Sequence, residues 1–201
     1  MRVIGITGGP CGGKSTILRA IKKNFGKKSG VQVVNEAATA LLKVFPVPYR
    51  DVPLTKEWLI GFQKAVKTLQ EESLIAWCQS GAKVLVSDRG LADGPAYLGN
   101  QQEFCEVFKC QMDDLWWPYD EIIYLPSLAT INPGLYWEKR GSNKCRYESS
   151  LAEAQALDRR LHDAWVGCQK RATWTYLAGT MEENARAVLQ IVAENLAGEV
   201  G

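Results

Sequence analysis

A glycine-rich segment near the start of the chain restricts the possible folds more than any other feature. Residues 8–15 read Gly-Gly-Pro-Cys-Gly-Gly-Lys-Ser and match G-x-x-x-x-G-K-[ST] at every fixed position. The segment follows the apolar run Arg2–Thr7, which is typical of a buried strand, and precedes an expected helix, Thr16–Phe25. Main-chain N–H groups of such a loop can turn inward, and the helix dipole adds positive potential. The segment therefore predicts a phosphate-binding loop.

The side chains of this loop have predicted roles in holding a nucleotide. Lys14 is expected to bridge the outer phosphates, and the Ser15 hydroxyl is expected to bind Mg²⁺. Thr16 is a candidate contact of the α-phosphate. The other candidate nucleotide-binding residues are Gly9, Cys11, Gly12 and Gly13. The alternative is a turn that merely joins a strand to a helix, but motif and context together favour the phosphate-binding loop.

Strand and helix patterns alternate along the rest of the chain. Further strands are expected at Val31–Asn35, Ala82–Ser87, Glu121–Leu125 and Thr173–Leu177. Helices are expected at Ala37–Val44, Thr55–Gln79, Gln101–Asp114, Leu151–Trp165 and Met181–Leu196. Loops are expected at Phe45–Leu54, which contains three prolines, and at the polar segment Asn132–Ser149. This order predicts an α/β fold of the P-loop NTPase type over residues 1–201, one domain with a five-stranded parallel sheet and helices on both faces.

Charged residues follow two of the expected strands. In an open α/β sheet, ligands bind beyond the carboxyl ends of the strands. Asp88 ends one strand and suits Mg²⁺ coordination, and the adjacent Arg89 suits a phosphate or a carboxylate. Glu36 follows another strand and could accept a proton from an attacking hydroxyl or orient it. The alternative for Glu36 and Asp88 is a solvated carboxylate or a helix N-cap, and Asp93 could be only a turn or cap residue.

A basic segment before the last strand is a candidate lid over residues 132–150. Phosphoryl transfer spreads negative charge over the transferred group, and late-supplied arginines stabilise that charge. Arg146 and Arg140 are the candidates for this role, and Lys139 and Lys144 are lesser ones. Trp137 could stack on a base or anchor the loop. The alternative is a solvated surface loop.

Composition excludes several classes of protein. Lys and Arg number 24 against 22 Asp and Glu, and a formal net charge of +2 argues against a dedicated nucleic-acid binder. The presence of only one histidine, His162, argues against a Ser-His-Asp or Cys-His catalytic site. The six cysteines include no Cys-x-x-Cys pair, which is typical of reduced thiols in a cytoplasmic protein. No run approaches the roughly 20 apolar residues of a membrane span.

Seven tryptophans are unusual for this length. Trp58 and Trp77 fall on the apolar stripe of the long expected helix, and Trp165 and Trp174 also indicate core positions. The neighbours Trp116 and Trp117 differ, because adjacent side chains on a regular element cannot both face inward. One of them could line a pocket, cover the lid or contact a partner.

Three segments together resemble a family of small P-loop domains described as AAA domains, related to nucleoside and nucleotide kinases. The segments are residues 8–16, residues 34–38 (Val-Asn-Glu-Ala-Ala) and residues 88–93 (Asp-Arg-Gly-Leu-Ala-Asp). This family includes a domain similar to the ribosylnicotinamide kinase half of bacterial NAD regulators, and animal relatives are described as GTP-binding regulators. The resemblance implies a kinase-type sheet, a phosphate-binding loop, a catalytic carboxylate paired with an arginine, and an arginine-bearing lid. It assigns these roles to Lys14, Ser15, Glu36, Asp88, Arg89, Asp93 and Arg146.

The sequence therefore predicts a phosphotransferase. Mg-ATP, or GTP, would donate its γ-phosphate to a small-molecule acceptor that carries a hydroxyl or phosphate. The alternative is a nucleotide-dependent switch or ATPase with a protein or lipid partner. An acceptor-side carboxylate, Glu36, favours the first function, because a switch needs no acceptor base. The acceptor, the choice of ATP or GTP and any homo-oligomer stay open.

Overall fold

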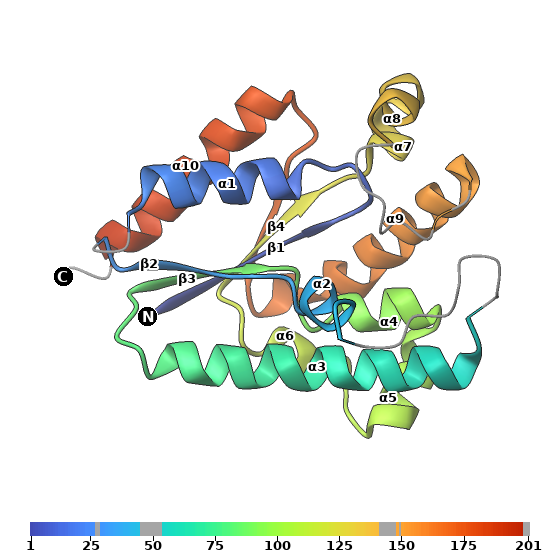
Figure 1. The fold of residues 1–201 in the computed structure, drawn as a ribbon. Coiled ribbons are helices and arrows are strands. Elements are labelled where there is room, and N and C mark those ends of the chain that lie inside the picture. Colours follow the sequence, from blue (N-terminus) through green and yellow to red (C-terminus); the bar gives the residue numbers. More distant parts are fainter. Residues whose placement is uncertain (27–28, 45–53, 141–147, 149, 199–201) are drawn as a thin grey trace.

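The centre of the molecule is a five-stranded sheet in which all neighbouring strands are parallel (Figure 1). The computed structural model describes residues 1–26, 29–44, 54–140, 148 and 150–198. The strands follow the spatial order β2-β3-β1-β4-β5. They are β1 (Arg2–Gly8), β2 (Val31–Val34), β3 (Val84–Asp88), β4 (Glu121–Leu125) and β5 (Thr173–Tyr176). The α/β class and the five-stranded parallel sheet expected from the sequence are confirmed.

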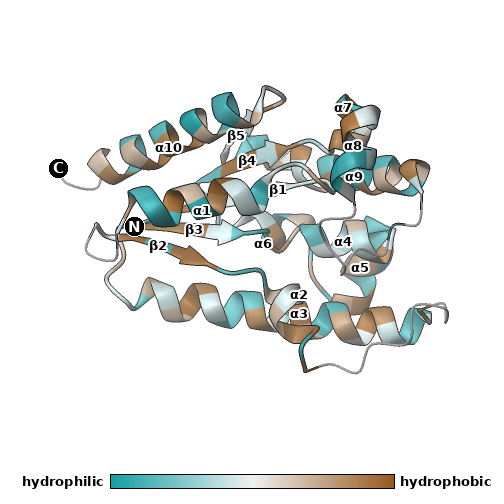
Figure 2. Cartoon of the chain, turned by 45° about the horizontal axis from the view of Figure 1, so that its top comes forward, coloured by the Kyte–Doolittle hydropathy of each residue, from teal (hydrophilic) through white to brown (hydrophobic). Residues whose placement is uncertain are grey.

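Helices cover both faces of this sheet. The helices α1 (Lys14–Asn24) and α10 (Met181–Gly198) lie on one face, where Ile17 and Val188 pack against Ile4. The long helix α3 (Lys56–Cys78) and the helix α9 (Leu151–Val166) lie on the other face, where Trp165 packs in one cluster with Val3. Figure 2 shows hydrophobic residues along the central strands and hydrophilic turns on the outer helices. Successive side chains of a strand therefore pack into two separate cores, one on each face of the sheet, because they point to opposite faces.

The remaining helices are short and lie in the connections between the strands and the longer helices. They are α2 (Ala37–Leu41), α4 (Asp93–Leu98), α5 (Gln101–Phe108), α6 (Met112–Trp116), α7 (Leu128–Ile131), α8 (Pro133–Arg140) and the 3₁₀ turn η1 (Gly167–Lys170). The expectation of one helix over Gln101–Asp114 was wrong. Lys109 adopts φ 50°, a left-handed conformation that ends α5, and α6 then begins at Met112.

The segment expected as a loop over Asn132–Ser149 contains a helix. Residues 133–140 form α8, which begins with Pro133, a residue suited to the first helical position. Tyr136 is fully buried in a small cluster with Ala129 and Ala154, and this packing stabilises the turn. The polar composition of the segment led to the prediction of a loop, whereas the buried Tyr136 packs α8 against the protein. Residues 141–147 and 149, which include Lys144 and Arg146, lie outside the described residues, as do residues 45–53 of the other expected loop.

The tryptophans divide much as their pattern predicts. Trp165 is fully buried, and Trp58, Trp77 and Trp174 are partly buried against core clusters. Trp116 packs on the core and its Nε1 donates to the main-chain oxygen of Ala164 at 2.9 Å, whereas the adjacent Trp117 is 75% exposed. These two side chains therefore point in different directions, as expected for neighbours. Neither is among the residues that line the large pocket described next.

Candidate functional site

The glycine-rich loop turns sharply between the end of β1 and the start of α1. Gly8 has φ 132°, and a Cβ there would lie 1.9 Å from the main-chain oxygen of Leu125. Gly13 caps α1 with φ 89°, and a Cβ there would lie 2.0 Å from the Cε of Met181. Both positions need glycine, since a side chain would meet backbone strain and a close neighbour. The loop therefore exposes main-chain groups at the N-terminus of α1, the arrangement that binds phosphate.

Lys14 folds back over this loop. Its Nζ donates to the main-chain oxygens of Gly8 at 2.6 Å and Gly9 at 2.9 Å. Burial and then the charge of Arg89 lower the pKa of Lys14 to about 8. Nearby carboxylates offset only part of these two effects. The ammonium group is therefore held at the loop in a place where an anionic ligand would stabilise its charge.

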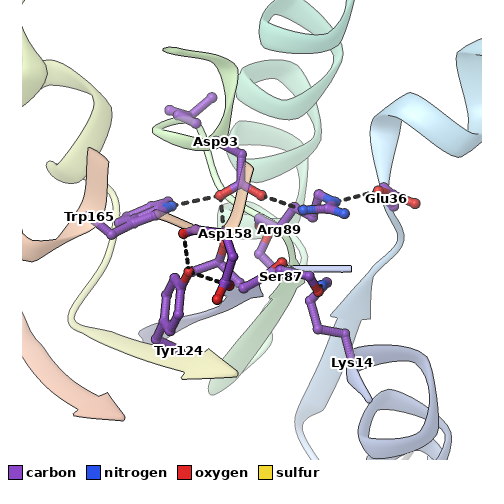
Figure 3. Close-up of polar contacts among 12 residues, drawn as sticks. Lys14, Glu36, Ser87, Arg89, Asp93, Tyr124, Asp158 and Trp165 are labelled. Atoms are coloured by element: carbon purple, nitrogen blue, oxygen red, sulfur yellow. Dashed lines mark hydrogen bonds and ion pairs between the residues drawn. The ribbon is translucent and has the colours of Figure 1, made fainter. Parts of the chain in front are cut away.

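A chain of ion pairs lies at the carboxyl ends of the neighbouring strands. Arg89 Nε donates to Glu36 Oε1 at 2.5 Å, and Arg89 Nη1 donates to Asp93 Oδ2 at 3.0 Å (Figure 3). The Arg89 guanidinium also lies 5.3 Å from the centre of the Tyr97 ring. Arg89 has φ 71°, an uncommon backbone conformation for a residue other than glycine and one that often marks functional sites. The sequence predicted these charged residues but not that Arg89 would join Glu36 to Asp93.

Asp93 is the centre of this network rather than a turn residue at the surface. It is 4% exposed, and Oδ1 accepts from Thr7 Oγ1 and from Trp165 Nε1, both at 2.6 Å. The N-cap of α4 is Ala92, so Asp93 is not the cap either. Its carboxylate thus joins β1, α4 and α9 around Arg89.

The two half-buried carboxylates of the site, Glu36 and Asp88, differ in their affinity for a proton. Burial raises the pKa of Glu36, but Arg89 and a hydrogen bond from Thr39 outweigh it, so the pKa lies below its usual value. Burial and then the charge of Glu36 raise the pKa of Asp88 to about 6. Within the described residues, the Asp88 side chain makes no hydrogen bond, whereas Glu36 makes two. Glu36 is therefore held ionised and oriented, and Asp88 is left to accept an incoming cation or donor.

These groups line one large pocket of about 1180 Å³. One end is the glycine-rich loop, which contributes residues 10–16, and the other end is a wall formed by α3. On that wall Trp58 and Phe62 stack with ring centroids 5.0 Å apart, and the buried Gln63 and Gln70 add amide groups. The volume exceeds the roughly 300–1,000 Å³ of an ordinary small-molecule site. There is space for one ligand on the loop and a second beside α3.

A second buried carboxylate supports the loop from behind. Asp158 of α9 accepts from Tyr124 Oη at 2.8 Å, from the N–H of Ser127 at 3.0 Å and from Thr130 Oγ1 at 2.6 Å (Figure 3). A Cβ at Gly9 would lie 2.3 Å from Asp158 Oδ1, so the loop rests on this carboxylate. Ser127 Oγ in turn donates to the main-chain oxygen of Pro10 at 2.6 Å. The sequence prediction missed Asp158 completely.

The remaining predicted residues differ in whether they line the pocket. Arg146 lies outside the described residues, and Arg140 is the last residue of α8. Lys139 lines the pocket, but Trp137 is 51% exposed and is not among its lining residues. Arg160, which the sequence prediction missed, lines the pocket from α9 and donates from Nε to the main-chain oxygen of Ala96 at 2.9 Å. Arg160 therefore provides an arginine that lines the pocket from a regular helix.

The parallel strand order and the glycine-rich loop define the chain as a P-loop protein with a kinase-type α/β fold. A family model described as an AAA domain matches residues 3–184. The chain belongs to this family. No curated protein matches it.

Among solved structures, the chain is similar to a deoxyadenosine kinase from M. mycoides with bound dATP. The TM-score is 0.60, and the match covers 95% of this chain and 99% of that chain at 13% sequence identity. At this identity the likeness shows a shared fold. The described helices include none that is long and apolar enough to cross a membrane.

Proposed function

We propose that the protein is an ATP-dependent kinase for a small, hydroxyl-bearing acceptor of the nucleoside type. The observation that carries the proposal is the position of Glu36, which lines the same pocket as the phosphate-binding loop and is oriented by Arg89 and Thr39. A switch that only binds a nucleotide needs no carboxylate oriented to accept a proton from an acceptor hydroxyl. The similarity in fold to a deoxyadenosine kinase supports the same class of reaction.

The residues at the loop suit Mg²⁺ as well as a triphosphate. Ser15 offers a hydroxyl, and Asp88 offers a carboxylate without a hydrogen-bond partner in the described part of the chain. No group of three or more His, Cys, Asp or Glu side chains that could hold a metal exists among the described residues. Few protein ligands suit Mg²⁺, which usually combines one or two protein oxygens with phosphate and water. Ser15 and Asp88 would hold the ion, which would neutralise charge on the phosphates.

The reaction follows from the placement of these groups. Lys14 and the main-chain N–H groups of the loop bind the phosphates of ATP. The acceptor hydroxyl donates a hydrogen bond to Glu36, which is ionised because its pKa is low. The hydroxyl oxygen forms a bond to the γ-phosphorus while the bond between that phosphorus and the β,γ-bridging oxygen breaks, and ADP leaves. The hydroxyl proton passes to Glu36, and Arg89 balances the charge of that carboxylate.

The test measures ADP release from Mg-ATP with a library of nucleosides and related vitamins. At least one acceptor should stimulate release, and Glu36→Gln should reduce stimulated release by about 100-fold or more, the scale of a lost general base. ATP binding should persist, because the loop is unchanged. Glu194→Gln is the matched control, since Glu194 accepts a hydrogen bond from Gln190 on the outer part of α10. The proposal is wrong if no acceptor stimulates release, or if Glu36→Gln retains the parent rate.

A further inference from the structure

Two cysteines lie at the turn that ends α5, and neither lines the large pocket. The left-handed residue Lys109 ends the helix, and its N–H donates to the main-chain oxygen of Cys105. The N–H of Cys110 donates to the same oxygen at 3.1 Å. A helix end of this kind folds the chain back, so that the residue after the left-handed one packs on the last helical turn. The turn therefore brings Cys110 onto Cys105.

The side chains at these two positions of a helix end are usually apolar and in contact. Here both are free thiols, and both are half-buried. Burial, followed by the charge of Cys105 and a hydrogen bond with its side chain, raises the pKa of the Cys110 thiol to about 11. The two thiols therefore interact, and Cys110 keeps its proton at neutral pH.

This arrangement suits the formation of a disulfide. A disulfide requires Cα atoms about 4.4–6.8 Å apart and side chains that are directed toward each other. The hydrogen bond between the main chains of Cys105 and Cys110 holds the two backbones close, and the contact between the thiols gives the direction. The other described cysteines lie on different elements, namely Cys11 in the glycine-rich loop, Cys78 at the end of α3 and the fully buried Cys168 in η1.

The helix that carries the first cysteine supports the wall of the pocket. Phe104, the residue before Cys105, is fully buried and stacks on Phe108 with ring centroids 4.2 Å apart. A Cβ at Gly94 of α4 would lie 2.7 Å from Phe104 Cε2, so the two helices pack closely. Gly94 and its neighbour Asp93 line the pocket on the other side. The cysteine pair therefore lies at the end of a helix that packs behind the ion-pair network.

We propose that Cys105 and Cys110 form a redox site, which a small-molecule disulfide such as oxidised glutathione converts into an intramolecular disulfide that fixes the end of α5. The proposal does not depend on the kinase activity. A disulfide at this place closes the turn covalently and prevents the last turn of α5 from opening. Oxidation therefore acts on the support of the α3 end of the pocket and not on the phosphate-binding loop.

The oxidation takes place by two exchange steps. The thiolate of Cys105 attacks one sulfur of the small disulfide, whose S–S bond breaks, and the first small thiolate leaves. Cys110 then attacks the sulfur of Cys105, the bond to the small molecule breaks, and the proton of Cys110 passes to the second departing thiolate. The protein loses two electrons and two protons, and the small disulfide is reduced to two thiols. Cys105 attacks first because the Cys110 thiol stays protonated.

The test exposes the full chain to mixtures of reduced and oxidised glutathione, blocks the remaining thiols by alkylation in acid, and maps the peptides by mass spectrometry. The product should contain a bond between Cys105 and Cys110 and should be lighter than the reduced protein by two hydrogen atoms. The bond should form at a concentration of oxidised glutathione at least about tenfold lower than the one that modifies the exposed Cys78, because the second thiol is held beside the first. Dithiothreitol should reverse it.

Single substitutions separate the roles of the two cysteines. Cys110→Ser should accumulate glutathione at Cys105 as a mixed disulfide, because no second thiol completes the exchange. Cys105→Ser should acquire glutathione at Cys110 at least about tenfold more slowly, because little Cys110 thiolate is present. Cys78→Ser is the matched control and should form the disulfide as the parent does. In the parent, oxidation should slow amide hydrogen exchange in α5 by about tenfold and leave α1 unchanged.

Several results overturn the proposal, and the peptide map of the parent protein suffices for the first two. One is a parent in which glutathione stays attached to Cys105 or Cys110 without a bond between them. Another is modification of Cys78 before the pair is oxidised. The proposal also fails if Cys110 is modified as fast as Cys105 in the single variants, or if exchange in α5 does not change on oxidation. None of these measurements uses a nucleotide, so a failed kinase proposal leaves their interpretation unaffected.

Discussion

The two ends of the pocket are built from different parts of the polypeptide. The phosphate-binding end consists mostly of main-chain groups from residues 8–16 and 177–181, whose shape depends on glycine conformation and on Asn184. The α3 end consists of side chains, and Glu36, Arg89 and Asp93 from different elements are joined there by ion pairs. The phosphate-binding end can bind phosphate groups, which are common to the ligands of many enzymes. At the α3 end, the charged side chains that would take part in the chemistry also hold packed elements together.

This difference implies different consequences of mutation. A charged group that points into the phosphate-binding loop contributes to ligand binding and little to folding. A charged group buried within the ion-pair network contributes to both, because its loss leaves an unpaired charge inside the protein. Substitutions at the two ends therefore distinguish the contribution of a charged group to ligand binding from its contribution to folding.

The largest effect is expected at the phosphate-binding end. Lys14→Ala should weaken Mg-ATP binding by roughly 100-fold, because a hydrogen bond to a charged group contributes roughly 1.5–3 kcal/mol. Turnover should fall by about 1,000-fold, the loss seen when a single charge-stabilising donor is removed from a reacting centre. The free energy of unfolding should not decrease, because burial already lowers the pKa of Lys14 and so disfavours its charge in the empty loop. Calorimetry and urea unfolding measure these quantities.

Lys22→Ala is the control for this variant. Lys22 lies on the same helix and donates to Asn35 Oδ1 at 2.7 Å at an exposed position. It should leave ATP binding at the parent level. A Lys14→Ala protein that binds ATP as tightly as the parent would contradict the assignment of the phosphate-binding loop.

A smaller loss of activity, but a large loss of stability, is expected in the ion-pair network. Asp93→Asn removes the charge that neutralises Arg89 and replaces an acceptor with a donor beside Thr7 and Trp165. Breaking a buried ion pair costs about 3–5 kcal/mol, so urea unfolding should show a decrease of about 3 kcal/mol. Turnover should fall because Arg89 and Glu36 lose their fixed arrangement. ATP affinity should change less than turnover, because among the described residues Asp93 is hydrogen-bonded to Thr7, Arg89 and Trp165 and not to residues 8–16.

Asp113→Asn provides the comparison at the surface. Its partner is Arg171 at 2.9 Å, and the two side chains are 54% and 47% exposed. An exposed pair contributes about 0–1 kcal/mol, so this variant should unfold nearly as the parent does. If Asp93→Asn lowers ATP affinity as strongly as turnover, the two ends of the pocket are not separable and the comparison fails.

The same contrast explains which parts of the site could be predicted from the sequence. Eight contiguous residues carry the phosphate-binding loop, and the sheet follows from alternating strand and helix patterns, so both are visible in a single sequence. Glu36 and Arg89 were predicted from the rule that ligands bind beyond strand ends. Their pairing across 53 positions is a tertiary contact that no local pattern encodes.

Asp158 and Asn184 were missed although the sequence contained a signal for both. Each lies on the apolar stripe of its helix, Asp158 in register with Ala154 and Leu161, and Asn184 in register with Val188. A polar residue in such a stripe is buried and must find partners. The pattern indicates that a buried network exists. It does not identify the partners, which for Asn184 are main-chain groups outside any regular element.

The smallest predicted effect is a pH dependence of nucleotide binding that arises from Lys14. The pKa of Lys14 in the empty protein is about 8, so the side chain loses its proton as pH rises through that value. Bound phosphates favour the charged form, so binding of Mg-ATP should take up a proton above about pH 7, and the affinity should fall roughly tenfold between about pH 7 and 9. Calorimetry in buffers of different ionisation enthalpy measures the uptake directly. Lys14→Arg should abolish the uptake, because a guanidinium stays charged throughout this range. Uptake that persists in Lys14→Arg would place the titrating group elsewhere.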